Sequence, residues 1–426
     1  MSVFPEGFLW GASTAAHQVE GEQRNNWSEW EPENAELLSS GANSRLSPDV
    51  PRWKMISEQA QSLGNYISGT AADHHKLSVQ DIRLMKQLNL TAYRFSVEWS
   101  RIEPQRGKFD EKVLNHYLNF VRELKENNIE PIVVLHHFTN PLWFEELGGW
   151  HSREAPELFG VYAAKVVSEL KSSCNKFLTF NEVNAYVLSR YLGGGIWAGW
   201  PGAETNIFKL RKALSNFTTT HKAVYKQLHE TDNTLQIGID HGYVIFKPQR
   251  LDPVTLLFAK ISEYVSNELF SKKIRGFEDI LGVHYYVRMD VRAGFTSIRK
   301  WVKHYDSDKK TDMGWGIYPR GIYEITQKLK SKNLPIYITE NGLADGRDMY
   351  RAEFIADHLH WLHQSIQDGA DVRGYFHWSL FDNFEWSEGY WPKFGLITVN
   401  KDTQERTIKG SAAVYAQIAK NNRLSD

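Results

Sequence analysis

The stretch Phe177-Leu178-Thr179-Phe180-Asn181-Glu182 is an apolar run that ends in a carboxylate. A second stretch, Ile336-Tyr337-Ile338-Thr339-Glu340-Asn341-Gly342, repeats this pattern later in the chain. Each is typical of a short strand that is buried on both faces and becomes polar only at its end. In a barrel of parallel strands, the carboxyl ends of the strands face the active site. The two stretches therefore predict a pair of glutamates at one end of such a barrel.

Similar short apolar runs recur along the 426 residues and alternate with helical patterns. We expect eight strands, at 8–13, 92–98, 131–137, 176–181, 236–241, 280–285, 335–339 and 374–378. Ser78 is a candidate N-cap for one helix, and further helices are expected at 111–127, 155–172, 208–230, 318–332 and 350–367. Two segments without clear periodicity are expected to be loops, 34–62 and 293–314.

This alternation predicts an α/β fold, a single (β/α)8 TIM barrel that forms one domain over residues 1–426, with the active site at the carboxyl ends of the strands. A doubly wound open sheet is the second candidate. It is disfavoured because no predicted strand ends in a glycine-rich dinucleotide-binding loop.

Composition narrows the functional classes. The formal net charge of −1 gives no electrostatic reason to expect nucleic acid as a partner. No apolar stretch approaches the ~20 residues of a membrane span, and the first residues do not resemble a signal peptide. The single cysteine, Cys174, excludes an internal disulfide and favours a buried, inert thiol in a reducing compartment. We therefore expect a cytoplasmic protein without a membrane or nucleic-acid partner.

Polar groups follow most of the predicted strands. They are Gln18, Arg94, Glu98, His136, His137, Asn181, Glu182, His284, Tyr286, Glu340, Trp378, Glu385 and Trp386. Buried polar groups are costly unless they are paired, so this many at one end of a barrel indicate a polar ligand. Saccharide hydroxyls both donate and accept hydrogen bonds and would pair with such groups. Glu182 and Glu340 would then supply the two carboxylates that glycosidic bond hydrolysis requires.

A metal site is a competing interpretation, because the sequence contains the pairs His74-His75 and His136-His137. Adjacent strand residues point to opposite faces, so neither pair is expected to share an ion. We therefore expect neither a metal nor a cofactor. Arg94 is open to two interpretations, a structural ion pair or a partner that keeps a carboxylate charged.

Taken together, these motifs resemble glycoside hydrolase family 1, the retaining β-glucosidase and β-galactosidase family, over nearly the whole chain. The most specific stretch is Trp378-Ser379-Leu380-Phe381-Asp382-Asn383-Phe384-Glu385-Trp386. Thr179-Phe180-Asn181-Glu182 resembles the family's acid/base motif, and Ile338-Thr339-Glu340-Asn341-Gly342 resembles its nucleophile motif. Further matching stretches lie at 4–13, 18–21, 92–101, 389–390 and 394–396.

The resemblance implies a role for each matching residue. Glu182 would be the acid/base and Glu340 the nucleophile, with the carboxyl groups ~5–5.5 Å apart for a retaining mechanism. Arg94 and Tyr286 would lie beside Glu340, and Asn181 would bind the sugar 2-hydroxyl. The remaining sugar contacts implied are Gln18, His137, Glu385 and Trp386, with Trp378 as the stacking floor.

Several positions depart from the family pattern, namely His17, Phe138, Thr139, Val183 and His284. His284 replaces the usual asparagine near the catalytic centre and puts the hydrogen bonding on the aglycone side in question. The segment between the sixth and seventh predicted strands is short for the family. This suggests a wider cleft that accepts larger aglycones or oligosaccharides.

The expected function is that of a retaining exo-β-glycosidase that hydrolyses unphosphorylated β-D-glucosides through a glycosyl-enzyme, with β-galactosidase or β-fucosidase side activity. Glu385 and Phe394 disfavour 6-phosphoglycosides, because a carboxylate near the sugar 6-position repels phosphate. The balance between glucosides and galactosides stays open, since the two sugars differ only at C4. The alternatives are an inactive sugar-binding protein on the same scaffold, a transglycosidase and a metal-dependent barrel hydrolase.

Overall fold

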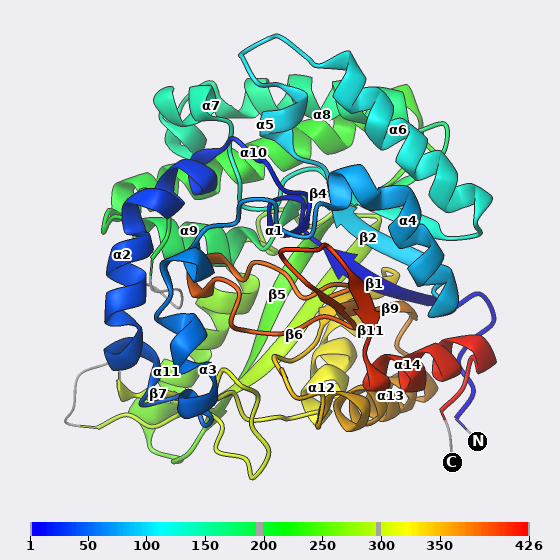
Figure 1. The fold of residues 1–426 in the computed structure, drawn as a ribbon. Helices are drawn as coiled ribbons and strands as arrows, with labels where there is room; N and C mark the ends of the chain where they lie inside the picture. Colours follow the sequence, from blue (N-terminus) through cyan, green and yellow to red (C-terminus); the bar gives the residue numbers. More distant parts are fainter. Residues whose placement is uncertain (1, 193–198, 295–299, 425–426) are drawn as a thin grey trace.

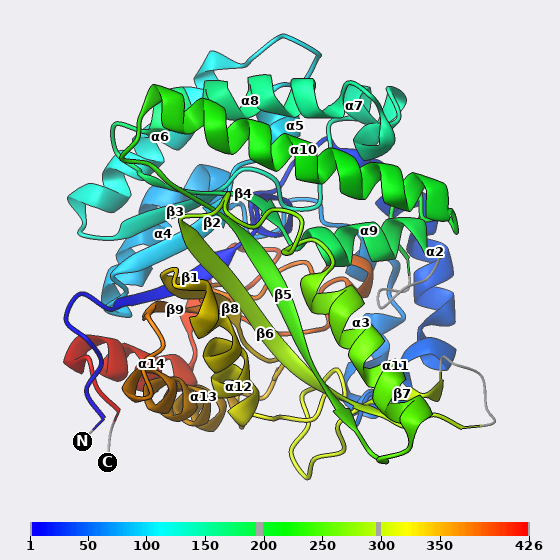
Figure 2. The same ribbon diagram turned by 180° about the vertical axis from the view of Figure 1, so that it is seen from behind.

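Eight parallel strands close into a barrel at the centre of the molecule (Figures 1 and 2). The computed structural model describes residues 2–192, 199–294 and 300–424. The barrel strands are β1 (Leu9–Thr14), β2 (Ala92–Ser96), β3 (Glu130–Val134), β4 (Lys176–Asn181), β5 (Gln236–Pro248), β6 (Ile280–Val291), β8 (Ile336–Asn341) and β9 (Val372–Trp378). Neighbouring strands pair in chain order, and pairing of β9 with β1 closes the ring. The predicted TIM barrel is confirmed.

An outer helix lies between each pair of consecutive barrel strands, and one more helix follows the last strand. These outer helices are α4 (His74–Gln87), α6 (Glu111–Glu126), α8 (Ala155–Leu170), α10 (Ile207–Thr231), α11 (Pro253–Glu263), α12 (Arg320–Leu329), α13 (Arg351–Gln367) and α14 (Gly410–Asn421). Figure 1 shows them around the strands, with the two chain ends close together. None of the helices in the described part of the chain combines the length and the apolar character that a membrane span requires.

The loop predicted at 34–62 is wrong, because this region contains most of α2 (Asn26–Leu46) and all of α3 (Trp53–Ala60). Asn25 caps α2 by accepting hydrogen bonds from the backbone amides of Trp27 and Ser28. The buried face of α2 consists mainly of small or isolated residues, including Ala35, Leu38 and Ala42. Such a thin apolar stripe, with a proline inside the helix, hides the helical period in the sequence.

The structure corrects several other boundaries. Helix α4 begins at His74, four residues before the predicted cap Ser78, so His74 and His75 lie on a helix and not on a strand. The expected loop at 293–314 contains the short strand β7 (Val302–His304), which pairs antiparallel with β6, while 295–299 lie outside the described residues. Three further helices were not predicted from the sequence, namely α11, α14 and the helix that follows β4, α9 (Val183–Tyr191).

The remaining elements are short. They are α1 (Ala16–Val19), α5 (Trp99–Ile102), α7 (Leu142–Glu146), β10 (Ile397–Val399), β11 (Arg406–Ile408) and the single helical turns Leu63–Tyr66, Gly149–His151, Tyr264–Glu268, Lys330–Lys332 and Trp386–Glu388. Strands β5 and β6 continue beyond the barrel as a long pair, which Figure 2 shows running toward α11.

Apolar side chains fill the barrel interior below the polar end. Residues from six different strands form one cluster there, comprising Ala92, Ile132, Val134, Leu178, Ile280, Tyr337 and Phe376. Arg94 lies two residues beyond Ala92 on β2, so its side chain faces the same interior one layer higher. The packed layer thus supports a polar layer at the carboxyl ends of the strands.

Candidate active site

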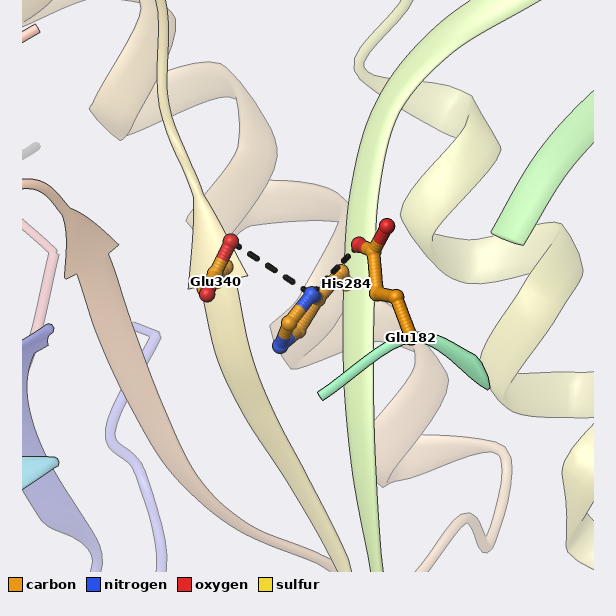
Figure 3. Close-up of side chains that lie close together, drawn as sticks. All are labelled: Glu182, His284 and Glu340. Atoms are coloured by element: carbon orange, nitrogen blue, oxygen red, sulfur yellow. Dashed lines mark hydrogen bonds and ion pairs between the residues drawn. The ribbon is translucent and has the colours of Figure 1, made fainter. Parts of the chain in front are cut away.

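Glu182 and Glu340 meet at the carboxyl ends of β4 and β8. Glu182 has a left-handed backbone (φ 41°) at the turn from β4 into α9, and its side chain retains 17% exposure. Glu340 lies within β8 and is 5% exposed. One oxygen of each carboxylate lies within 4.8 Å of the other, with His284 between them (Figure 3). The structure therefore brings the two predicted glutamates into one site.

Two donors hold the Glu340 carboxylate. Arg94 Nη1 donates to Oε1 at 2.5 Å, and the Tyr286 hydroxyl donates to Oε2 at 2.7 Å. Burial raises the pKa of Glu340 above that of an ordinary glutamate, although the charges of His284 and Arg94 oppose this shift. The two donors fix the orientation of the carboxylate and favour its ionised form.

Arg94 also connects Glu340 to the neighbouring strands. Its Nη2 donates to Asn181 Oδ1 and to Asp240 Oδ2, both at 2.6 Å. Asp240 is fully buried on β5, and Gly282 leaves room for its carboxylate on the adjacent strand. Burial opposes its charge, but Arg94 and His284 outweigh that effect and hold the pKa of Asp240 low.

Asp240 was absent from the predicted site, because the fifth strand was the one to which no polar strand end was assigned. A signal was present in the sequence, since the predicted strand 236–241 ends in the polar residues Asp240 and His241. A buried charge of this kind requires a partner. Arg94 was the available cation, and the structure pairs the two.

His284 contacts three acidic groups. Its Nδ1 lies 2.6 Å from Glu182 Oε1 and 3.4 Å from Glu340 Oε2, while its Nε2 lies 3.4 Å from Asp240 Oδ1 (Figure 3). A shift in the register between β6 and β8 falls at His284, where its Cα is paired with that of Glu340. Burial alone would lower the pKa of His284, but Glu340, Asp240 and Glu182 outweigh it and raise the pKa to about 9.

The same three side chains could also hold a metal ion. Among the described residues, Glu182, His284 and Glu340 form the group whose potential ligand atoms all lie within 4.8 Å of one another. Imidazole and carboxylate ligands suit zinc and related transition metals.

A second polar group lies beside the carboxylate pair and contains the predicted sugar contacts. Gln18 Nε2 donates to Phe384 O at 2.7 Å and lies 3.4 Å from Glu385 Oε2. The Gln18 Oε1 atom is buried and has no partner within the described residues, so it is free to accept a hydrogen bond. Burial and the nearby charge of Glu340 raise the pKa of Glu385 to about 8.

Three predicted ring contacts stack together beside this polar group. The His137 ring lies nearly parallel to Trp378, with centroids 6.2 Å apart, and to Trp386, with centroids 5.8 Å apart. Burial holds the pKa of His137 well below that of an ordinary histidine, so the ring is neutral at pH 7. His17 stacks on Trp386 and pairs with Glu31 at 2.7 Å.

Other polar strand ends lie outside this group. The Glu98 carboxylate accepts hydrogen bonds from Ser100 and Thr139, and His136 pairs with Asn140 at 2.9 Å. These contacts connect loops and α-helices around the site.

Burial raises the pKa of the Cys174 thiol to about 12, which agrees with the predicted inert thiol.

A (β/α)8 barrel with two carboxylates this close at its strand ends has the architecture of a glycoside hydrolase. The model of Glycosyl hydrolase family 1 matches residues 1–272 and 266–424, and the chain belongs to this family. The chain is 31% identical to β-glucosidase A of Thermotoga maritima, with 99% of each chain covered. It is 27% identical to the 6-phospho-β-glucosidase GmuD of Bacillus subtilis, with 98% of each covered. A solved β-glycosidase from Pyrococcus horikoshii superposes with a TM-score of 0.87 at 36% identity, covering 100% of this chain and 96% of the other.

Proposed function

We propose that this glycoside hydrolase is a retaining exo-β-glycosidase that acts on unphosphorylated β-D-glucosides, with side activity on β-galactosides and β-fucosides. The observation that carries the proposal is the separation of the carboxylates. Oxygens of Glu182 and Glu340 lie within 4.8 Å of each other. Retaining enzymes hold the two carboxyl groups ~5–5.5 Å apart, whereas inverting enzymes need ~6.5–9.5 Å for a water molecule.

In the proposed first step, Glu340 attacks the anomeric carbon while Glu182 protonates the departing oxygen. Glu182 suits the acid role because it is the more exposed of the two carboxylates. In the second step, Glu182 removes a proton from water, which attacks the glycosyl-enzyme and releases Glu340. Asn181, whose Oδ1 accepts a hydrogen bond from Arg94, would bind the sugar 2-hydroxyl.

The environment of Glu385 favours plain over phosphorylated sugars. Its side-chain hydrogen bonds go to the uncharged Gln18 and Trp378, and Glu340 and Glu388 act on it as negative charges. A phosphate carries a charge of about −1.5 to −2 at pH 7 and is bound most strongly by cations. Below pH 8 the Glu385 carboxyl is protonated and uncharged, so the expected repulsion of phosphate comes from Glu340 and Glu388 and not from Glu385 itself, whose proton can be donated to a sugar hydroxyl. Gln18 and Glu385 can contact either epimer at C4, which supports activity on glucosides and galactosides alike.

The test is hydrolysis of p-nitrophenyl glycosides by the wild type and Glu340→Gln, with product anomers followed by NMR. We expect turnover of β-glucoside with initial release of β-glucose, loss of turnover in Glu340→Gln, and slower turnover of the 6-phospho-β-glucoside. A 2-deoxy-2-fluoro-β-glucoside should label Glu340 covalently, as seen by mass spectrometry of the peptide. Initial release of α-glucose would refute retention, and faster turnover of the phosphorylated substrate would refute the assigned substrate class.

Two alternatives have distinct outcomes in the same assay. Sugar binding without turnover of any glycoside would identify an inactive binding protein. Transfer of glucose to an added alcohol or sugar, at the expense of hydrolysis, would identify a transglycosidase.

A cytoplasmic location stays a prediction that rests on the single cysteine.

A further inference from the structure

Two pairs of consecutive residues meet beside the carboxylate pair, where the proposed sugar contacts lie. His17-Gln18 belong to α1, and Glu385-Trp386 open the last of the single helical turns. Gln18 Nε2 donates to Phe384 O at 2.7 Å, and the Phe384 amide donates to Gln18 O at 3.3 Å. The rings of His17 and Trp386 lie 5.6 Å apart between centroids and within 11° of parallel. The backbone segments of the two pairs are therefore joined by hydrogen bonds on one side and by a ring stack on the other.

Trp386 has a backbone conformation that its surroundings must maintain. Its φ of 49° lies in the left-handed region, which is unfavourable for a bulky side chain. The indole contacts the rings of Trp27, Phe138 and His137 at centroid distances of 4.8, 5.3 and 5.8 Å. His17 is the most nearly parallel of these four neighbours. The orientation of the indole therefore depends on its ring contacts, including the stack with His17.

Hydrogen bonds to both nitrogens fix the His17 ring. Asn25 Oδ1 accepts from the amides of Trp27 and Ser28, each at 3.0 Å, which identifies the other end of this side chain as Nδ2. Asn25 Nδ2 is a donor and lies 3.1 Å from His17 Nδ1, so Nδ1 accepts. The hydrogen-bond pattern thus assigns the ring proton to Nε2, which donates to Glu31 Oε1 at 2.7 Å.

Glu31 connects this ring to α2 and to the segment before α4. It is 2% exposed, and its Oε2 accepts from the amide of Ser68 at 2.8 Å and from the Ser68 hydroxyl at 2.7 Å. These bonds and the one from His17 satisfy a carboxylate that would be costly to bury alone. Ser68 O in turn accepts from the Tyr390 hydroxyl, and the Tyr390 ring packs edge-on against Phe384. The connection therefore returns to the segment that contains the proposed sugar contacts.

We propose that His17 is a positioning residue for the contacts to the outer hydroxyls of the sugar. Held by Glu31, its ring stacks on Trp386 and fixes where the indole lies. The adjacent side chains Gln18 and Glu385 are then fixed relative to each other, with Nε2 and Oε2 3.4 Å apart. The inference deepens the proposed function and rests on it, because these side chains are sugar contacts only under that proposal.

Glu31→Gln tests this role without changing a proposed sugar contact. The glutamine oxygen can still accept from Ser68, which turns its amide nitrogen toward His17 Nε2. Two donors would then face each other. Moving the ring proton to Nδ1 does not resolve the conflict, because Nδ1 would then face the donor of Asn25. The ring must therefore give up one of its two hydrogen bonds and its fixed position.

The assay compares 2,4-dinitrophenyl β-glucoside with the β-xyloside, which lacks the C6 hydroxymethyl group. A displaced Glu385 should harm only the substrate that has a 6-hydroxyl to contact. We expect kcat/KM of Glu31→Gln to fall ~10-fold on the glucoside, about the value of one hydrogen bond, and clearly less on the xyloside. The glucoside/xyloside ratio of kcat/KM is therefore expected to fall.

The matched control is Glu278→Gln. Glu278 Oε1 lies 2.6 Å from His241 Nε2, and both side chains are buried, so this variant perturbs another short His–Glu pair. It should leave the glucoside/xyloside ratio unchanged. A merely structural role of His17 would lower thermal stability and both rates together, in Glu31→Gln as in the control.

Two double variants cover failure of Glu31→Gln to fold. His17→Phe/Glu31→Gln removes the opposed donors and keeps a ring beside Trp386, whereas His17→Ala/Glu31→Gln also removes the ring. We expect the glucoside/xyloside ratio to be close to wild type in the first and reduced in the second. Equal ratios in these two variants overturn the inference.

An unchanged ratio in folded Glu31→Gln also overturns the inference, as does an equal change in Glu278→Gln. Wild type without glycosidase activity refutes the proposed function. Active wild type together with an unchanged ratio in Glu31→Gln refutes only the role of His17.

Discussion

Gly242 on β5 makes room for the carboxyl group of Glu182, and filling that room tests the acid/base role directly. A Cβ at Gly242 would lie 2.8 Å from both Cδ and Oε1 of Glu182. Nonbonded carbon atoms prefer a separation of about 3.5–4.0 Å. In Gly242→Ala the Glu182 carboxyl must therefore move by roughly 0.7–1.2 Å, which disrupts its 2.6 Å contact with His284.

The size of the effect follows from this displacement. Misplacing a catalytic group by about 1 Å can cost ~10²-fold in rate, which corresponds to ~2.7 kcal/mol. The loss should concern proton donation, because Glu340 keeps its contacts with Arg94 and Tyr286. The fold should tolerate the methyl group, since its close contacts are with the flexible end of a side chain.

The assay is kcat/KM on methyl and 2,4-dinitrophenyl β-glucosides, together with thermal unfolding. We expect Gly242→Ala to lose ~10²-fold on the methyl glycoside and far less on the activated one, whose leaving group needs no proton. Gly41→Ala in α2 is the control, because no described atom lies within 4 Å of the position that the added methyl group would take. Equal losses on both substrates, or an undiminished rate on the methyl glycoside, would refute the assignment of Glu182.

Three further predictions concern the same site. Tyr286→Phe removes the 2.7 Å hydrogen bond to Glu340 and should slow breakdown of the glycosyl-enzyme by ~10–100-fold. The glycosyl-enzyme should then accumulate and be detected by mass spectrometry of the intact protein. A variant that accumulates no glycosyl-enzyme would contradict this role of Tyr286. Burial raises the pKa of Glu340, so activity should be lost as the pH falls through a value above the pKa of an ordinary glutamate. Arg94→Met removes the cation that opposes this shift and should move the acidic limb of the kcat/KM profile to higher pH. An acidic limb that the substitution leaves unchanged would count against the ion pair. EDTA should leave activity intact, and loss of activity in EDTA would instead favour the metal-dependent alternative. Zn²⁺ should inhibit the enzyme by binding Glu182, His284 and Glu340. It should inhibit the His284→Asn variant less.

The barrel could be predicted because each barrel strand contains a short apolar run that is recognisable by itself, even where β5 and β6 continue beyond that run. The predicted strand 176–181 matches β4, whereas β8 continues two residues beyond the predicted end at 339 and includes Glu340 and Asn341, because these polar residues are buried and still pair in the sheet. Helix α2 could not be predicted in the same way, because its buried face mixes a few separated apolar residues with the polar residues Asn26, Glu31 and Ser39. Its stability depends on the Asn25 cap and on tertiary contacts that sequence periodicity does not report.

The residues of the candidate site could be predicted from the sequence, but most of the hydrogen bonds between them could not. The family resemblance implied that Arg94 and Tyr286 lie beside Glu340, and the structure has both within hydrogen-bonding distance of it. Asp240 was missed because one aspartate in a strand is ambiguous until a cation is found opposite it. The separation between His284 and Glu182 depends on the left-handed turn at Glu182 and on the register shift at His284. Neither feature has a clear sequence signature, since neither residue is a glycine.

The placement of His284 also accounts for how a buried site can tolerate the proposed reaction. Arg94 and Asp240 remain an ion pair throughout, while Glu340 loses its charge when it forms an ester. In the proposed reaction, the proton that Glu182 gives to the aglycone leaves one negative charge on Glu182, so the net charge of the cluster does not change. The imidazole lies 3.4 Å from the carboxylate that loses charge and 2.6 Å from the one that gains it. Because buried charge is costly, moving it a few ångströms past a polar ring should require less reorganisation than creating or removing it.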